Sequence, residues 1–261
     1  MSFSAQHVVP APRTDVWAWH TRPGALTRLN APFAFMTPVQ QAQSLGDGTS
    51  ILRLPGGLQW KAQHVLSRYQ EGYSFSDECV NSPLRQLTQW RHTHTFAEDS
   101  AGTRVTDEVD TRVPSAALKS VFAYRQHQLI EDFAFFKRLR DAGLNTRPLT
   151  IAMTGSRGSV GTALTAQLRT AGHTVIQLVR GKAGSGQRHW NTNLPDPHLL
   201  DGVDVLVHLA GEPIFGRFND EHKAAIRDSR VGPTERLARL TGTTDSVRTM
   251  VCASAVGYYG S

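Results

Sequence analysis

The chain has 261 residues, which is longer than most single domains and predicts two. A hydrophobic content of 39% and a charged content of 19% are typical of a globular protein and exclude a disordered, collagen-like or coiled-coil chain. No apolar run approaches the ~20 residues that cross a bilayer, so no membrane span is expected. The two cysteines, Cys79 and Cys252, are expected to be ordinary buried residues. Two cysteines are too few for a disulfide framework, and this predicts a cytoplasmic location.

The net charge of +6 is spread along the chain. Residues 1–146 carry 15 basic and 13 acidic side chains, and residues 147–261 carry 13 and 9. The basic residues form neither blocks nor stripes, which is typical of an arginine-rich surface and not of a nucleic-acid footprint. We therefore expect no nucleic-acid partner.

The first half of the sequence predicts a strand, a short helix, several further strands and a long helix. Turn signals such as Gly46-Asp47-Gly48 and Pro55-Gly56-Gly57 separate the strands. In chain order, the predicted elements are strand Phe3–Val9, a helix capped by Thr14 and running to about Trp19, and strands Met36–Leu45, Thr49–Leu54, Leu58–Tyr69, Tyr73–Val80, Arg85–Phe96 and Thr103–Val113. Pro114-Ser115 opens the long helix, and residues 145–148 form a linker.

The second half predicts strands that alternate with helices. Such alternation specifies right-handed crossovers and a parallel sheet. The predicted elements are strands Leu149–Thr154, Thr174–Val179, Asp204–Leu209 and Thr249–Ser254, and helices Ser159–Ala171 and Asp220–Leu240.

A glycine loop joins the first strand of this half to its helix. Gly155, Gly158 and Gly161 stand three residues apart, as a dinucleotide-binding loop requires. The first permits a sharp turn, the second lets backbone approach a pyrophosphate, and the third lets helix and strand pack closely. Ser156 and Val160 belong to the same predicted cofactor loop.

The end of the second strand indicates which dinucleotide binds. An NAD-binding unit usually has an acidic residue there, whereas this chain has Arg180. Arg180 and Arg157 of the glycine loop could pair with a 2′-phosphate, which favours NADP over NAD. The alternative is that both arginines are solvated at loop ends.

Four motifs in order carry a resemblance to a known superfamily. They are Thr-Gly-x-x-Gly-x-x-Gly from Thr154, Leu209 to Ile214, Asp228 to Thr234, and Ser254 to Gly260. Together they resemble the extended or atypical short-chain dehydrogenase/reductases, and most closely the NAD(P)-dependent nucleoside-diphosphate-sugar epimerase-like proteins. The resemblance implies that Leu209, Ala210 and Gly211 line the cofactor. It also implies that Ser254 lies near the nicotinamide as a catalytic and cofactor-binding residue.

The sequence departs from that superfamily in its catalytic motif. Its members transfer protons through a Tyr-x-x-x-Lys helix, and this sequence contains no such motif. Tyr258 and Tyr259 have no lysine after them and are expected to pack near the cofactor. We therefore expect a nucleotide-binding half that lacks the catalytic and substrate regions, with an unpaired sheet edge through which copies could associate.

The order of elements in the first half resembles the START-like superfamily, also called SRPBCC or polyketide cyclase/dehydrase. That resemblance implies a curved sheet gripping the long helix, with an apolar ligand cavity between them. The candidate cavity residues are Trp60, Trp90, His92, His94 and Phe96. His92 and His94 share a strand face, but no third ligand, His64 included, stands at convincing spacing, so we expect no metal.

The sequence therefore predicts an α+β helix-grip domain over residues 1–145 and an α/β Rossmann parallel-sheet domain over residues 148–261, incomplete at its C-terminus. The functional hypothesis is an epimerase-like NAD(P)-dependent oxidoreductase with an attached small-molecule-binding module, as a fragment of a longer protein. The alternative is a non-catalytic carrier of an apolar small molecule.

Overall fold

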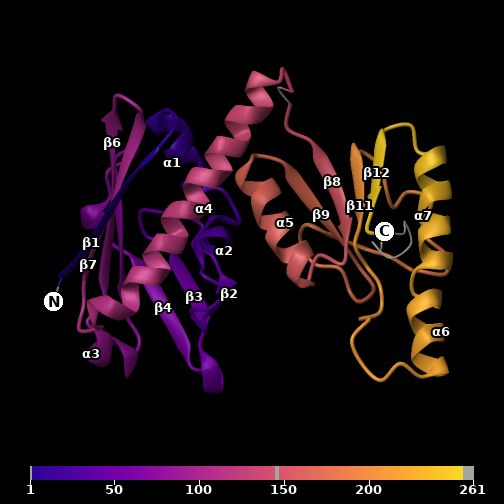
Figure 1. The fold of residues 1–261 in the computed structure, drawn as a ribbon, viewed down its shortest axis with the longest axis horizontal. Coiled ribbons are helices and arrows are strands. Elements are labelled where there is room, and N and C mark those ends of the chain that lie inside the picture. Colours follow the sequence, from indigo (N-terminus) through magenta and orange to yellow (C-terminus); the bar gives the residue numbers. More distant parts are fainter. Residues whose placement is uncertain (1, 145–146, 255–261) are drawn as a thin grey trace, which may run out of the picture. The chain divides into compact units, whose positions relative to one another are not determined.

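A computed structural model describes residues 2–144 and 147–254. The chain divides into two compact units, Met1–Asn145 and Thr146–Ser261. Within the described ranges, no helix combines the length and the apolar character needed to cross a membrane. Each unit is built around its own sheet, as Figure 1 shows.

The first unit is built on a seven-stranded antiparallel sheet in the order β1-β7-β6-β5-β4-β3-β2. Its strands are β1 (Ser2–Val9), β2 (Thr37–Gln40), β3 (Thr49–Arg53), β4 (Gln59–His64), β5 (Ser74–Cys79), β6 (Arg91–Asp99) and β7 (Gly102–Asp110). β1 closes the sheet beside β7, so the first and last strands of the unit are neighbours. Side chains that alternate along β6 and β7 are buried on one face of the sheet.

The long helix α4 (Ser115–Asp141) runs across that buried face (Figure 1). It turns an apolar stripe to the sheet, in which Leu118, Phe122, Leu129 and Phe133 are all buried. The short helices α1 (Arg13–Thr21) and α2 (Ala25–Leu29) cover the rest, and Trp17 and Trp19 of α1 join the main core. The result is a sheet and helices that enclose a core, with room left toward β3, β4 and β5.

Several predicted boundaries in this unit are wrong. The strand predicted over Met36–Leu45 ends at Gln40, because the Gln41 side chain bonds the backbone of residues 22 to 26 and carries the chain out of the sheet. The strand predicted over Leu58–Tyr69 ends at His64 and is followed by a 3-10 turn, Leu66–Arg68. Thr14 does not cap α1, which begins at Arg13 after Pro12.

The largest error concerns the strand predicted over Arg85–Phe96. Its first part is helix α3 (Leu84–Thr88), in which the Thr88 hydroxyl donates to the Leu84 carbonyl. Only the part from Arg91 onward is strand. Leu84 and Leu87 are three residues apart, which fits a helical turn, but so short a segment carries too few residues for periodicity to separate it from the strand that follows.

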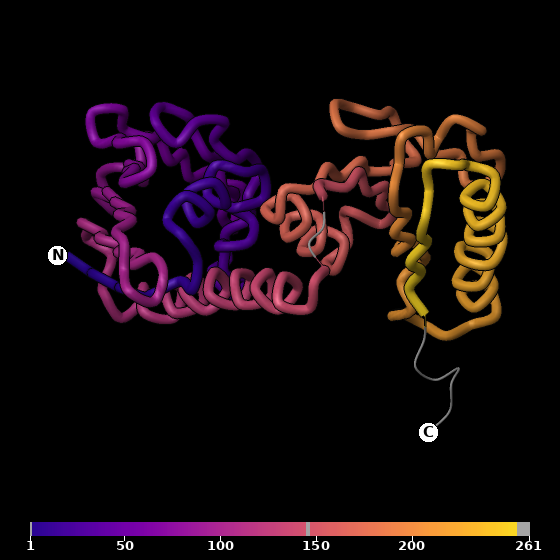
Figure 2. Tube along the Cα trace, turned by 90° about the horizontal axis from the view of Figure 1, so that it is seen from above, coloured from indigo at the N-terminus to yellow at the C-terminus, as the bar shows by residue number. Residues whose placement is uncertain are grey.

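The second unit is built on a five-stranded parallel sheet in the order β10-β9-β8-β11-β12, which is typical of a Rossmann-like domain. The strands are β8 (Thr150–Thr154), β9 (Thr174–Val179), β10 (Gln187–His189), β11 (Val205–His208) and β12 (Thr249–Cys252). Helix α5 (Ser159–Thr170) packs on one face, and helix α7 (Val231–Thr243) packs on the other, beside β12 (Figure 2). Helix α6 (Asp220–Asp228) precedes α7.

Three details differ from the sequence prediction. The helix predicted over Asp220–Leu240 is interrupted between α6 and α7, because Pro233 has no N–H to continue the bonding ladder back to Ser229. Strand β10 was not predicted, since three residues carry no periodic pattern. Cys252, expected to be buried, is exposed at the end of β12, whereas Cys79 is buried.

Candidate functional sites

The glycine loop between β8 and α5 is packed so closely that two of its glycines admit no side chain. Gly155 has φ +66°, and a Cβ there would lie 2.6 Å from the Leu209 carbonyl carbon. A Cβ on Gly161 would lie 2.2 Å from the Gly155 carbonyl oxygen. Gly158 instead caps α5 and donates its N–H to Gly155, and a Cβ on Gly158 would come no closer than 3.4 Å to that carbonyl oxygen. The loop therefore holds its shape through backbone contact.

A buried threonine fixes this loop to the next strand. The Thr154 hydroxyl lies 3.1 Å from the backbone nitrogens of Leu209 and Ala210 and 2.7 Å from His208 Nδ1. The two backbone N–H groups donate to the hydroxyl oxygen, which leaves its proton for His208. Burial lowers the pKa of His208, with a smaller contribution from Arg230, so the ring is neutral and can accept that proton.

These strand ends border a pocket of about 570 Å³ in the second unit. Its walls come from the glycine loop, the end of β9, the segment after β11 and the junction of α6 with α7. The lining residues are Gly155, Ser156, Arg157, Gly158, Leu178, Val179, Arg180, Gly181, Trp190, Thr192, Asn193, Leu209, Ala210, Gly211, Glu212, Pro213, Asp228, Ser229 and Pro233. Ligands of open parallel sheets bind at this position, beyond the carboxyl ends of the strands.

The pocket offers both backbone donors and cations to an anionic ligand. Helix α5 begins at Ser159, and the N-terminus of a helix carries N–H groups without intrahelical partners and a partial positive charge. Arg157 and Arg180 are exposed and line the pocket from two different strand ends. The pocket is also lined by two acidic residues, Glu212 and Asp228, in the segment after β11 and at the end of α6. Its two arginines are in the glycine loop and at the end of β9.

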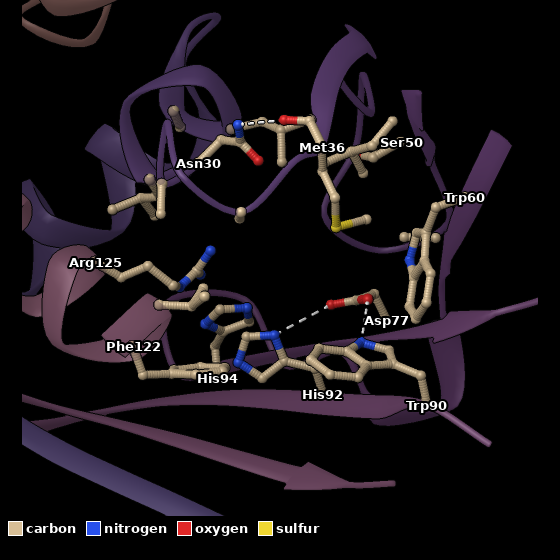
Figure 3. Close-up of a pocket in the computed structure, with 18 of the residues that line it drawn as sticks. Asn30, Met36, Ser50, Trp60, Asp77, Trp90, His92, His94, Phe122 and Arg125 are labelled. Carbon is tan, nitrogen blue, oxygen red and sulfur yellow. Dashed lines mark hydrogen bonds and ion pairs between the residues drawn. The ribbon is translucent and has the colours of Figure 1, made fainter. Parts of the chain in front are cut away.

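The first unit contains a separate cavity of about 540 Å³. It lies between the sheet and helices α2 and α4, and apolar side chains such as Leu29, Met36 and Phe122 form most of its wall. Figure 3 shows Trp60 and Trp90 at one end of the cavity and Arg125 of α4 at the other. The Arg125 Nε is buried and has no hydrogen-bond partner among the described residues.

One wall of this cavity is polar, with side chains of β5 and β6 facing the cavity and Asp107 of β7 behind them. Asp77 of β5 pairs in register with His92 of β6, and His94 of β6 pairs with Asp107 of β7. Asp107 Oδ1 accepts from His92 Nε2 and His94 Nδ1, each at 2.9 Å. His92 Nδ1 faces Asp77 Oδ2 at 3.6 Å, and Trp90 Nε1 donates to Asp77 Oδ1 at 3.2 Å (Figure 3).

Burial decides the charge of this wall. Desolvation lowers the pKa of His94 well below its usual value, so the ring is neutral. Burial acts to raise the pKa of Asp107, but hydrogen bonds from His92 and His94 outweigh it and hold that pKa well below the usual range. Nearby, burial lowers the pKa of His20 to about 4. The wall therefore presents the neutral imidazole of His94, held by the ionised carboxylate of Asp107.

Comparison with known proteins distinguishes the two units. Residues 151–261 match the model described as the NAD dependent epimerase/dehydratase family. The second unit is therefore similar to that family. An epimerase family protein from Mycobacterium bovis, Mb2239, is 45% identical over 115 residues, which cover 42% of this chain and 38% of that protein.

Two solved structures extend the comparison. A crystal structure described as the nucleoside-diphosphate sugar epimerase from Corynebacterium glutamicum is 52% identical, with a TM-score of 0.91, and covers 99% of this chain and 55% of that one. The human epimerase family protein SDR39U1, solved with NADPH, is 30% identical over 42% of this chain and 38% of its own, with a TM-score of 0.36. This chain therefore spans 38% of the Mb2239 relative and 55% of the Corynebacterium chain.

Most of the residues predicted for the cofactor border the pocket of the second unit. Val160 does not line it, because its side chain is 68% exposed on the outer surface of α5. Gly161 lies beneath the loop instead of facing the pocket. Ser254 follows β12 and is not among the lining residues, and Tyr258 and Tyr259 lie outside the described residues.

In the first unit, four of the five residues predicted for the cavity line it, namely Trp60, Trp90, His92 and His94. Phe96 is instead in the core, where its ring meets Trp17 at 5.4 Å. Sequence reasoning missed Asp77, Asp107 and Arg125. The two aspartates are recognisable only from strand register, which the sequence did not supply, whereas Arg125 follows Phe122 by one helical turn on α4.

Proposed function

We propose that the second unit binds NADP, in preference to NAD, in the pocket beyond β8, β9 and β11. One observation carries the proposal: the glycine loop leaves no room for a Cβ at Gly155, which meets Leu209 after β11, or at Gly161, which meets the Gly155 carbonyl, while the N-terminus of α5 borders the pocket. Pyrophosphate oxygens fit against the N–H groups of the first turn of α5, which begins at Ser159. The guanidinium groups of Arg157 and Arg180 fit a 2′-phosphate.

The bound cofactor would supply hydride transfer, and the residues of this chain would bind and orient it. Leu209, Ala210 and Gly211 form the wall opposite the loop, where Thr154 fixes their backbone. Ser254 is the proposed substrate-orienting residue near the nicotinamide. The proposed activity is that of an epimerase-like oxidoreductase acting on a small-molecule substrate. Its proton-transfer and substrate-binding groups would come from regions other than the motifs found in this sequence.

The cofactor proposal is tested by titrating the full chain with NADPH and NADH while following tryptophan fluorescence, because Trp190 lines the pocket. Arg180→Asp should weaken NADPH binding by about 10–150-fold, the value of a hydrogen bond to a charged group of about 1.5–3 kcal/mol. NADH binding should change little. Arg53→Asp makes the same charge change at an exposed position of β3 and is the control. An unchanged cofactor preference in Arg180→Asp would overturn the assignment.

A second candidate function, carriage of a small apolar molecule in the first unit, is favoured by the 540 Å³ cavity. It is tested with a fluorescent fatty acid added to the full chain. Met36→Trp replaces a slender side chain of the cavity wall by a bulky indole ring and should reduce binding of the probe, while NADPH binding stays unchanged. Equal probe binding by wild type and Met36→Trp would argue against the cavity as the binding site.

A further inference from the structure

We propose that Asp77, His92 and His94 form a binding site for one divalent transition-metal ion in the cavity of the first unit. One ligand atom from each residue lies within 4.8 Å of the other two. Two imidazoles and one carboxylate form a donor set that zinc and ferrous iron both accept. The site lies in a different unit from the proposed cofactor pocket and does not depend on it.

The spacing of Asp77 and His92 fits coordination better than a hydrogen bond. Asp77 Oδ2 and His92 Nδ1 are 3.6 Å apart, which is too far for a hydrogen bond. Ligand atoms bound to one zinc ion at 2.0–2.2 Å in tetrahedral geometry are about 3.4 Å apart. Side-chain shifts of about 1 Å would bring all three ligand atoms to such a separation.

The groups behind the three ligands are arranged as they are in metal sites. Metal-binding histidines almost always donate their second ring N–H to a carboxylate or carbonyl. Here Asp107 accepts from His92 Nε2 and His94 Nδ1, which leaves His92 Nδ1 and His94 Nε2 as the remaining ring nitrogens. Trp90 Nε1 donates a hydrogen bond to Asp77 Oδ1, and the other carboxylate oxygen, Oδ2, faces His92. Each ligand is therefore oriented by a partner on its far side.

Charge and access also suit a cation. Asp77 and Asp107 supply two carboxylates, and Arg125 of α4 is the one cationic side chain that lines the described cavity. Three protein ligands leave a coordination position open toward the cavity, as catalytic zinc sites do. That position would take an oxygen donor of a small molecule whose apolar part lies against Leu29, Met36 and Phe122. The cavity would thus recognise a ligand that is polar at one end.

The experiment uses the full chain without a histidine tag, stripped with a chelator and titrated with Co²⁺. We expect saturable visible absorption at one ion per chain, displaced by Zn²⁺, together with a rise in Tm on adding Zn²⁺. Asp77→Asn and His94→Ala should each weaken Co²⁺ binding by at least about 10-fold, and Asp107→Asn by about 10–100-fold. Asp77→Asn keeps the side-chain shape and the acceptor for Trp90, so it is the variant expected to fold best.

Two histidine variants serve as matched controls. His64 lines the same cavity but is outside the three-residue group, and His198 is an exposed histidine beside Asp201. His64→Ala and His198→Ala should bind Co²⁺ as the wild type does. Absence of one-to-one binding by the wild type, unchanged binding by folded Asp77→Asn and His94→Ala, or loss of binding in His198→Ala would each overturn the proposal.

Discussion

The two pockets are built by different means. In the second unit the pocket is bounded by backbone: glycines at strand and helix ends, N–H groups at the start of α5, and two carboxyl ends of parallel strands. In the first unit the polar wall consists of side chains of β5 and β6, which antiparallel register brings together and which Asp107 of β7 supports from behind. The glycine loop of the second unit can be recognised from a few consecutive residues, whereas the polar wall of the first unit depends on residues far apart in the chain.

This difference implies different sensitivities to mutation. A side-chain site fails when one polar group loses its partner, whereas a backbone site fails when a side chain is added where none fits. The four predictions below test that contrast, beginning with the largest expected effect.

Removing the carboxylate behind the two histidines should have the largest effect. Asp107→Ala leaves the N–H groups of His92 and His94 buried without their acceptor, which should lower the free energy of unfolding by about 2–6 kcal/mol, or about 1–3 kcal/mol for each donor. Urea denaturation measures it. Asp110→Ala, an exposed aspartate on the same strand, should change stability by no more than about 0.5 kcal/mol. Equal effects of the two variants would contradict the side-chain account.

Adding one methyl group to the glycine loop should have the next largest effect. In Gly161→Ala the new Cβ meets the Gly155 carbonyl oxygen at 2.2 Å, so the loop must shift. We expect a loss of about 1–3 kcal/mol in urea denaturation, together with loss of NADPH binding. Gly242→Ala, in α7 with nothing within 4 Å, should instead stabilise the chain by about 0.5 kcal/mol. A tolerated Gly161→Ala would refute the backbone account.

The same contrast explains what the sequence could predict. The glycine loop, α5 and the parallel strands were predictable because their signals are local: glycines three residues apart, a buried strand before them and a helix after them. Asp77 and Asp107 were not, since neither has a local signal that distinguishes it from other strand aspartates. Their role depends on pairing with His92 and His94, which is a property of the assembled sheet.

The errors in secondary structure have the same origin. Residues 85 to 88 stand just before the clear alternation of β6 and were predicted as part of the same strand, yet they lie in one helical turn in the connection between β5 and β6. The break at Ser229 could have been predicted from Pro233, whose position permits it only in the first turn of a new helix. The effect of a proline on a helix can be predicted from that one residue, whereas the helical conformation of α3 depends on the tertiary fold.

Acid should destabilise the first unit through its buried histidines. Burial lowers the pKa of folded His20 to about 4 and lowers that of His94 well below 6.5, so the unfolded chain binds more protons. This stability is fully present above pH 6.5 and is lost as the pH falls toward 4. Each such histidine should contribute about 1.4 kcal/mol per pH unit within that window.

Urea denaturation at pH 7, 6 and 5 measures this dependence. His20→Gln should reduce the slope of unfolding free energy against pH by one proton, while His198→Gln, at an exposed histidine, should leave the slope unchanged. A slope that is the same in wild type and His20→Gln would show that His20 is not buried in its neutral form.

Removing a single hydroxyl from the second unit should have the smallest effect. Thr154→Val keeps the shape of the side chain but leaves the N–H groups of Leu209 and Ala210 without their acceptor. We expect a loss of about 1 kcal/mol in urea denaturation. NADPH binding should weaken modestly, because the wall formed by residues 209 to 211 is less firmly held. Thr174→Val, at the exposed start of β9, is the control and should be neutral.

The register between β6 and its neighbours has a consequence for insertions and deletions. Side chains alternate across a strand, so one residue added within β6 before His92 would turn both histidines to the opposite face and away from Asp77 and Asp107. An addition at residues 100 and 101, in the turn that joins β6 to β7, would lengthen an exposed loop and leave the pairs intact. Length changes among relatives of this unit should therefore concentrate in the turn and avoid the strand.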